Sequence, residues 1–105
     1  MTRPKRARTE KREAARVADK LALQREKLAK LEPGGGPGRP IDVSTASVIE
    51  SHARALSCLR CAEGGARVAS HDAQELDGRR LRIVRVACPR CGAERVLYFR
   101  IVASN

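Results

Sequence analysis

Two short stretches decide how this chain folds: Cys58-Leu59-Arg60-Cys61 and Cys88-Pro89-Arg90-Cys91-Gly92. Together they contain all four cysteines of the 105-residue sequence. In a Cys-x-x-Cys turn two thiolates converge on one point, so two such turns complete a tetrahedral set of four sulfur ligands. The sequence therefore predicts one structural Zn²⁺ bound by Cys58, Cys61, Cys88 and Cys91. The arginine inside each turn is expected to offset the thiolate charge or lie in solvent, with phosphate contact as the alternative.

Other uses of these cysteines agree less well with the rest of the sequence. Two disulfides would require an oxidising compartment, and the first residues lack the apolar run of a secretory signal. A redox-active pair normally lies at the start of a helix, whereas both pairs here fall on turns between predicted strands. An iron–sulfur centre would use the same four thiolates and remains an alternative to zinc. His52 and His71 are poorly spaced to replace a sulfur, so neither is expected to be a ligand.

The segments around the cysteine pairs predict a small α+β fold. Strands are expected over residues 67–71, 81–87 and 96–102, with a polar loop at 71–80 that contains the strong turn signal Asp77-Gly78. Residues 40–43 are expected to be an extended entry. A short helix follows, with capping-box spacing from Ser47 to Glu50, and ends near Leu56. The predicted architecture is a three-stranded antiparallel sheet preceded by a short helix.

The first third of the chain differs in composition from the rest. All five lysines lie within the first 30 residues, and Thr9 is a candidate helix cap. Apolar residues recur with heptad spacing at Ala14, Val17, Leu21, Leu28 and Leu31, with Gln24 as the polar member. Three interpretations stay open: a solvated helix, a coiled-coil homodimer through residues 10–31, or a basic arm that orders on an anionic partner. We expect a basic helical extension at 1–32, a Gly/Pro linker at 33–40 and the metal-bound domain at 41–105.

Charge indicates the class of partner. The chain carries 22 basic and 12 acidic residues, a formal net charge of +10. A basic surface of this kind is typical of proteins that contact phosphates without reading sequence. The candidate nucleic-acid contacts are Arg3, Lys5, Arg6, Arg8, Lys11, Arg12, Arg79, Arg80, Arg82 and Arg85.

The two cysteine turns, set among three short antiparallel strands, resemble a zinc ribbon. The resemblance covers residues 58–102, and the first turn departs from the fuller pattern because Leu59 and Ala62 stand where Pro and Gly are usual. It implies a non-catalytic module that binds nucleic acid or protein. A zinc ion with four sulfur ligands has no open position for water, and so short a chain offers no pocket around a catalytic constellation. We therefore do not expect an enzyme.

Two functions follow from these features. The first is a nucleic-acid-associated regulator of transcription or translation, cytoplasmic and associated with nucleoid or ribosome, whose basic arm contacts phosphates. The alternative is a protein-interaction adaptor that uses the N-terminal helix and an edge strand of the ribbon. No stretch of about 18 uncharged apolar residues exists, so no membrane partner is expected. No small-molecule substrate is expected either.

Overall fold

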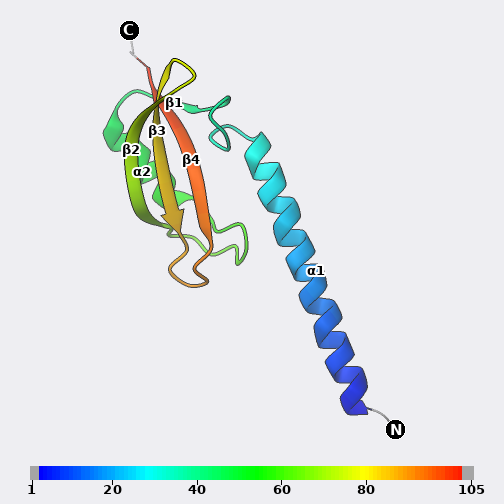
Figure 1. Ribbon diagram of the computed structural model, residues 1–105. Helices are drawn as coiled ribbons and strands as arrows, with labels where there is room; N and C mark the ends of the chain where they lie inside the picture. Colours follow the sequence, from blue (N-terminus) through cyan, green and yellow to red (C-terminus); the bar gives the residue numbers. More distant parts are fainter. Residues whose placement is uncertain (1–2, 103–105) are drawn as a thin grey trace.

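The computed structural model of the protein describes residues 3–102, with side chains from residue 8 onward. It consists of a small α+β unit and a long helix that projects from it (Figure 1). The elements in chain order are α1 (Arg3–Leu31), β1 (Ile41–Val43), α2 (Ala46–Ala55), β2 (Arg67–Leu76), β3 (Arg79–Ala87) and β4 (Glu94–Ile101).

The sheet has four strands in the order β1-β4-β3-β2 and is mixed, where the sequence predicted three antiparallel strands. β2, β3 and β4 pair antiparallel, but β1 adds to β4 in parallel, with Ile41 opposite Phe99. Three residues are too few to show strand periodicity, so the sequence suggested only an extended entry. Arg100 fixes β1 through two hydrogen bonds to Asp42, of 2.9 and 3.0 Å. The bond from Arg100 also lowers the pKa of Asp42.

The hairpin of β2 and β3 is longer than predicted. The prediction of a polar loop at residues 71–80 is wrong, because β2 continues to Leu76 and β3 begins at Arg79. Only Asp77 and Gly78 form the turn, and both have positive φ, 50° and 75°, as a type I′ turn requires. β2 is an edge strand with mostly exposed polar side chains, so it lacks the apolar alternation by which strands are recognised.

The core lies between α2 and one face of the sheet. Its buried side chains come from every strand except the edge strand β2: Val43, Ile49, Ala53, Val84, Val86, Leu97 and Phe99. Phe99 is fully buried and meets the His52 ring edge to face at 5.6 Å. The helix begins at Ala46 after the N-cap Thr45, so the predicted capping box does not form.

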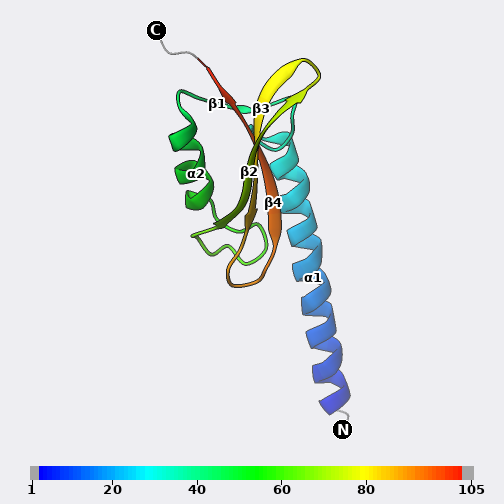
Figure 2. The same cartoon turned by 60° about the vertical axis from the view of Figure 1, so that its left-hand side comes forward.

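The long helix α1 lies on the opposite side of the sheet from α2 (Figure 2). It begins at Arg3, so Thr9 lies inside the helix and is not its cap. Only its C-terminal half lies beside the sheet, and a groove of about 480 Å³ separates it there from β4. The radius of gyration is 17.9 Å, whereas a compact chain of this length has one of about 13 Å. The difference reflects the projecting half of α1.

The Gly/Pro segment between α1 and β1 forms a hydrogen-bonded loop. Gly34 accepts a bond of 2.9 Å from the Tyr98 amide of β4, and Arg39 donates one of 2.6 Å to the carbonyl oxygen of Leu31. Gly35 passes so close to α1 that a Cβ there would collide with the Ala29 carbonyl oxygen. These contacts tie the loop to β4 and to the last turn of α1, and so fix where the helix ends beside the sheet.

Candidate metal centre

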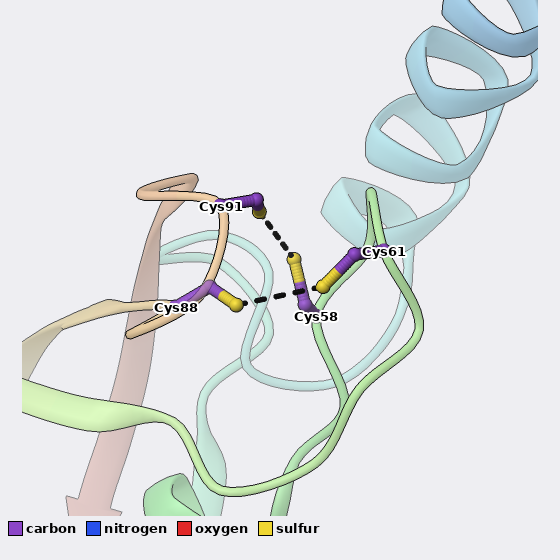
Figure 3. Close-up of side chains that lie close together, drawn as sticks. All are labelled: Cys58, Cys61, Cys88 and Cys91. Atoms are coloured by element: carbon purple, nitrogen blue, oxygen red, sulfur yellow. Dashed lines mark hydrogen bonds between the residues drawn. The ribbon is translucent and has the colours of Figure 1, made fainter.

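The four cysteines lie together although 26 residues separate the two pairs. Their sulfur atoms all lie within 4.8 Å of one another, and the Cys58–Cys91 and Cys61–Cys88 sulfurs are both 3.5 Å apart (Figure 3). A regular tetrahedron with metal–sulfur bonds of about 2.3 Å has sulfur–sulfur edges of about 3.8 Å. The four residues are therefore positioned to bind a metal ion, as the sequence predicted, and none of the four forms a disulfide.

The two turns have the same backbone hydrogen bonds. In the first, the Cys58 amide donates to the Glu63 carbonyl at 2.8 Å and the Ala62 amide donates back to Cys58 at 3.0 Å. In the second, the corresponding bonds join Cys88 with Ala93 and Gly92 with Cys88, both at 2.9 Å. Each pair of bonds closes the chain into a tight loop that aims both sulfurs inward. The first turn follows α2 and the second joins β3 to β4, so the sheet and α2 bring the loops together.

Both turns need a residue in the left-handed conformation at the same place, directly after the second cysteine. In the second turn this residue is Gly92, with φ of 76°. In the first it is Ala62, with φ of 62°. Alanine pays a steric cost in this region that glycine avoids. Ala62, which stands where the sequence pattern usually has glycine, is therefore a strained position in the structure.

The first cysteine of each turn ionises most readily. Amide donation from Cys91 and Arg90 lowers the pKa of Cys88 to about 6. At Cys58, desolvation raises the pKa, but the amides of Cys61 and Arg60 outweigh it and the pKa is lowered. The Arg60 amide lies 3.3 Å from the Cys58 sulfur.

The second cysteine of each turn behaves in the opposite way. At Cys61, the Glu63 amide lowers the pKa, but desolvation and contact with the other sulfurs raise it to about 12. At Cys91, the Ala93 amide lowers the pKa, but contact with Cys58 and desolvation raise it overall. Cys61 and Cys91 therefore keep their protons near neutral pH, whereas Cys88 loses its proton far more readily, and a cation must displace the remaining protons to gain all four ligands.

The arginines of the two turns are engaged by carboxylates. Arg90 donates to Glu63 at 3.2 Å, which ties the second turn to the first. Arg60 lies 3.7 Å from Glu26 of α1. Sequence reasoning missed both glutamates, because no local pattern relates a glutamate to an arginine 27 or more residues further along the chain. Their effect is to link the two metal-binding turns to each other and to α1.

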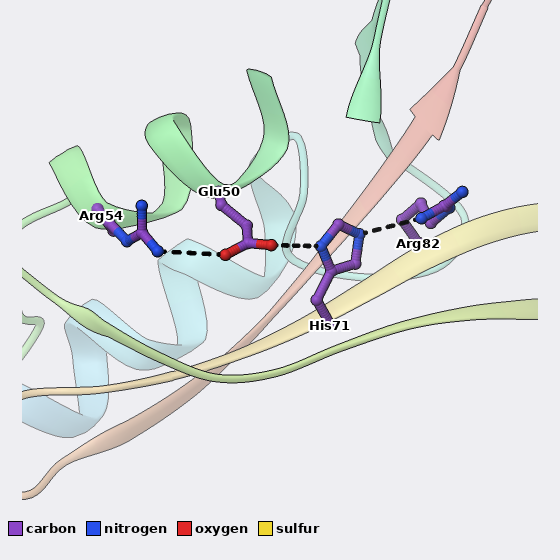
Figure 4. Close-up of polar contacts among 4 residues, drawn as sticks. All are labelled: Glu50, Arg54, His71 and Arg82. Carbon is purple, nitrogen blue, oxygen red and sulfur yellow. Dashed lines mark hydrogen bonds and ion pairs between the residues drawn. The ribbon is translucent and has the colours of Figure 1, made fainter. Parts of the chain in front are cut away.

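Neither histidine belongs to the cysteine cluster, as expected. His52 packs on Phe99, and His71 lies between α2 and the sheet (Figure 4). The His71 Nδ1 atom is 3.1 Å from Glu50, and its Nε2 atom is 3.4 Å from the guanidinium of Arg82. Glu50 also accepts a bond of 3.2 Å from Arg54, so it serves a network joining α2, β2 and β3 and does not cap its helix.

The predicted nucleic-acid contacts do not form one surface. Side chains alternate along β3, so Arg80 and Arg82 lie on the face that carries α2, while Arg79 and Arg85 lie on the other face. Arg82 is partly buried beside His71.

The other candidates lie in the projecting half of α1. Arg8, Lys11 and Arg12 are exposed there, whereas the side chains of Arg3, Lys5 and Arg6 are outside the described part of the chain. The hairpin turn and this segment lie at opposite ends of the molecule (Figure 1).

Two further observations concern the chain as a whole. Within residues 3–102, no helix combines the length and the apolar character needed to cross a membrane. Comparisons with protein-family models, with curated proteins and with solved structures find no match for this chain.

Proposed function

We propose that this protein is a non-catalytic zinc-binding module whose metal is structural and whose basic helix contacts the phosphates of nucleic acid. The observation that carries the proposal is the cluster of four sulfurs within 4.8 Å. Four thiolates with tetrahedral spacing match the preference of Zn²⁺, and a filled coordination sphere leaves no position for substrate or water. The metal would join the turn after α2 to the turn between β3 and β4.

The contact with nucleic acid is supported by the charge and shape of α1. Arg8, Lys11 and Arg12 are spaced so that they share one side of the helix, and this part of α1 projects beyond the sheet. The formal net charge of +10 favours any polyanion. Contacts of this kind release counterions, so binding should weaken steeply with salt and show little sequence preference.

Native mass spectrometry of the purified protein tests the metal. We expect one zinc per chain, lost when Cys58 and Cys88 are replaced by serine. A protein that remains folded and carries no metal, or one that carries an iron–sulfur cluster, would refute this part of the proposal.

Salt-dependent binding to a short DNA duplex and to a single-stranded RNA tests the partner. Replacing Arg8, Lys11 and Arg12 by glutamine should reduce the slope of log K against log salt by about three, since each phosphate contact contributes about one. The control variant replaces Arg16, Lys20 and Lys27 by glutamine, which removes the same charge from another side of the helix. Equal losses in both variants, or no binding at low salt, would contradict a specific basic face.

A further inference from the structure

The helix α1 exposes a continuous stripe of large apolar side chains. The exposed fractions are 57% for Val17, 45% for Leu21, 60% for Leu28 and 66% for Leu31. These residues follow the heptad spacing of a helix that pairs with another helix. Together with Ala14 and Gln24 they form what we call the seam, which is about 26 Å long at 1.5 Å per residue. No other described segment exposes so many large apolar side chains.

The seam faces away from the rest of the protein. The side of α1 that faces the first cysteine turn carries Glu26, which pairs with Arg60, and the small residues Ala22 and Ala29, which are buried. At 100° per residue, the seam is centred about 130° round the helix axis from this side. The protein therefore attaches α1 through its small residues and leaves its leucines in solvent.

The seam also lies on a different side of α1 from the basic face that we propose contacts phosphates. Arg8, Lys11 and Arg12 are centred about 160° from the seam by the same geometry. A ligand on one side would not block the other. An inference about the seam thus stands independently of the proposed function.

The charges beside the seam indicate what can cover it. Along its middle the charged flanking residues are all basic, namely Lys20 and Lys27 on one side and Arg25 on the other, and glutamates flank it only at its ends. In a parallel pair of two copies, heptad geometry places Lys20 against Arg25 of the other copy. In an antiparallel pair with the apolar residues aligned, Lys20 meets Lys27. Self-pairing therefore brings like charges together at the middle of the seam in both orientations, and only the parallel pair adds an opposite-charge contact, between Lys27 and Glu32 at the end of the seam.

From these observations we infer that residues 14–31 form a docking face for an amphipathic helix of another protein, with leucine-like residues along its apolar stripe and acidic residues beside it. The partner's apolar side chains cover Val17, Leu21, Leu28 and Leu31, and its carboxylates meet Lys20, Arg25 and Lys27. Burial of the seam supplies most of the affinity, and charge selects an acidic partner over a second copy.

The test uses the full-length, metal-loaded protein and a fluorescent 21-residue peptide with leucine at heptad positions a and d and glutamate at e and g. Anisotropy at physiological salt should show saturable one-to-one binding. The variant Leu28→Gln, and separately Leu21→Gln, should weaken binding at least about tenfold. The matched control is Leu23→Gln, because Leu23 is 50% exposed on the same helix but lies outside the seam. Circular dichroism verifies that each variant keeps its helix.

Three outcomes would overturn the inference. The peptide could bind equally well to Leu28→Gln and to the unaltered protein, which would reduce the interaction to charge alone. A peptide with lysine in place of glutamate could bind as tightly as the acidic one. Sedimentation could show a concentration-dependent dimer that Leu28→Gln abolishes and Leu23→Gln preserves, which would make a second copy the occupant. A failure of nucleic-acid binding in the arginine and lysine variants would leave the seam unaffected, so the two proposals fail separately.

Discussion

The left-handed residue of each cysteine turn allows a test of how the metal centre is built. The two turns share a backbone, yet this position is Ala62 in the first and Gly92 in the second. We consider the exchange of these residue types, Ala62→Gly and Gly92→Ala. A Cβ added at residue 92 would meet no atom within 4 Å, so the second substitution changes backbone strain without creating a clash.

The magnitude follows from two opposing terms. A residue with a Cβ costs about 1–2 kcal/mol in the left-handed region. Glycine avoids this cost, but it makes the unfolded chain more flexible, which costs about 0.4–1 kcal/mol. We therefore expect Ala62→Gly to stabilise the metal-bound fold by about 0.5–1 kcal/mol and Gly92→Ala to destabilise it by a similar amount.

Competition for Zn²⁺ with a chromophoric chelator measures the effect, because metal binding and folding of the turns are coupled. The apparent affinity should rise about two- to fivefold for Ala62→Gly and fall about as much for Gly92→Ala. Gly64→Ala is the control, since Gly64 has open space around it and its φ is outside the positive range. The assignment of strain to this position would be refuted if the Zn²⁺ affinity shifted in the same direction for both substitutions. It would also be refuted if the Gly92→Ala variant bound Zn²⁺ as tightly as the unaltered protein.

Three further predictions concern the metal, the thiols and the loop after α1. Removing zinc with a chelator should abolish the cooperative thermal transition of the sheet in circular dichroism, because the thin core needs the metal to close its turns; a preserved transition would contradict this. Since the pKa values of Cys61 and Cys91 are raised, both are thiols in the metal-free protein near neutral pH. Zinc binding should then release at least two protons, seen with an indicator dye in weak buffer. The affinity should rise as the pH increases from 7 to 8, by up to about a hundredfold if two protons are released; an affinity independent of pH would show that the thiols were already ionised. Gly35→Ala should lower the melting temperature and loosen α1, because the added Cβ would collide with the backbone of the helix. Gly38→Ala is the control and should have little effect, because a Cβ there would meet no atom within 4 Å. Equal melting temperatures for the two variants would disprove the close approach of Gly35 to the helix.

The contacts around the cysteine cluster indicate what a bound metal would control. Arg25 donates to the Leu59 carbonyl at 3.5 Å and Arg60 pairs with Glu26, so the first cysteine turn holds the C-terminal half of α1. Each bond is exposed and contributes little alone. Loss of the metal would free the turn that carries both partners of α1. The orientation of the helix, and with it both proposed binding faces, should therefore depend on the metal.

Local chemistry was sufficient to predict the cluster of four cysteines, the α+β class, the short helix, the turn at Asp77-Gly78 and the helical character of residues 10–31. These features depend on residues close together in the chain, since a Cys-x-x-Cys turn, a heptad or an Asp-Gly pair has the same preference in almost any context. The parallel strand β1, the full length of β2, the split of the arginines between two faces and the carboxylates beside the cysteine turns were not predictable. Each depends on contacts between segments distant in sequence. β1 is a strand because its backbone pairs with the edge of β4, and Arg82 lies beside His71 because the fold places α2 over that face of the sheet. The direction of the leucine seam is of the same kind. Heptad spacing shows that an apolar stripe exists, but only the tertiary structure shows that Ala22 and Ala29 are buried while the leucines of the stripe face solvent.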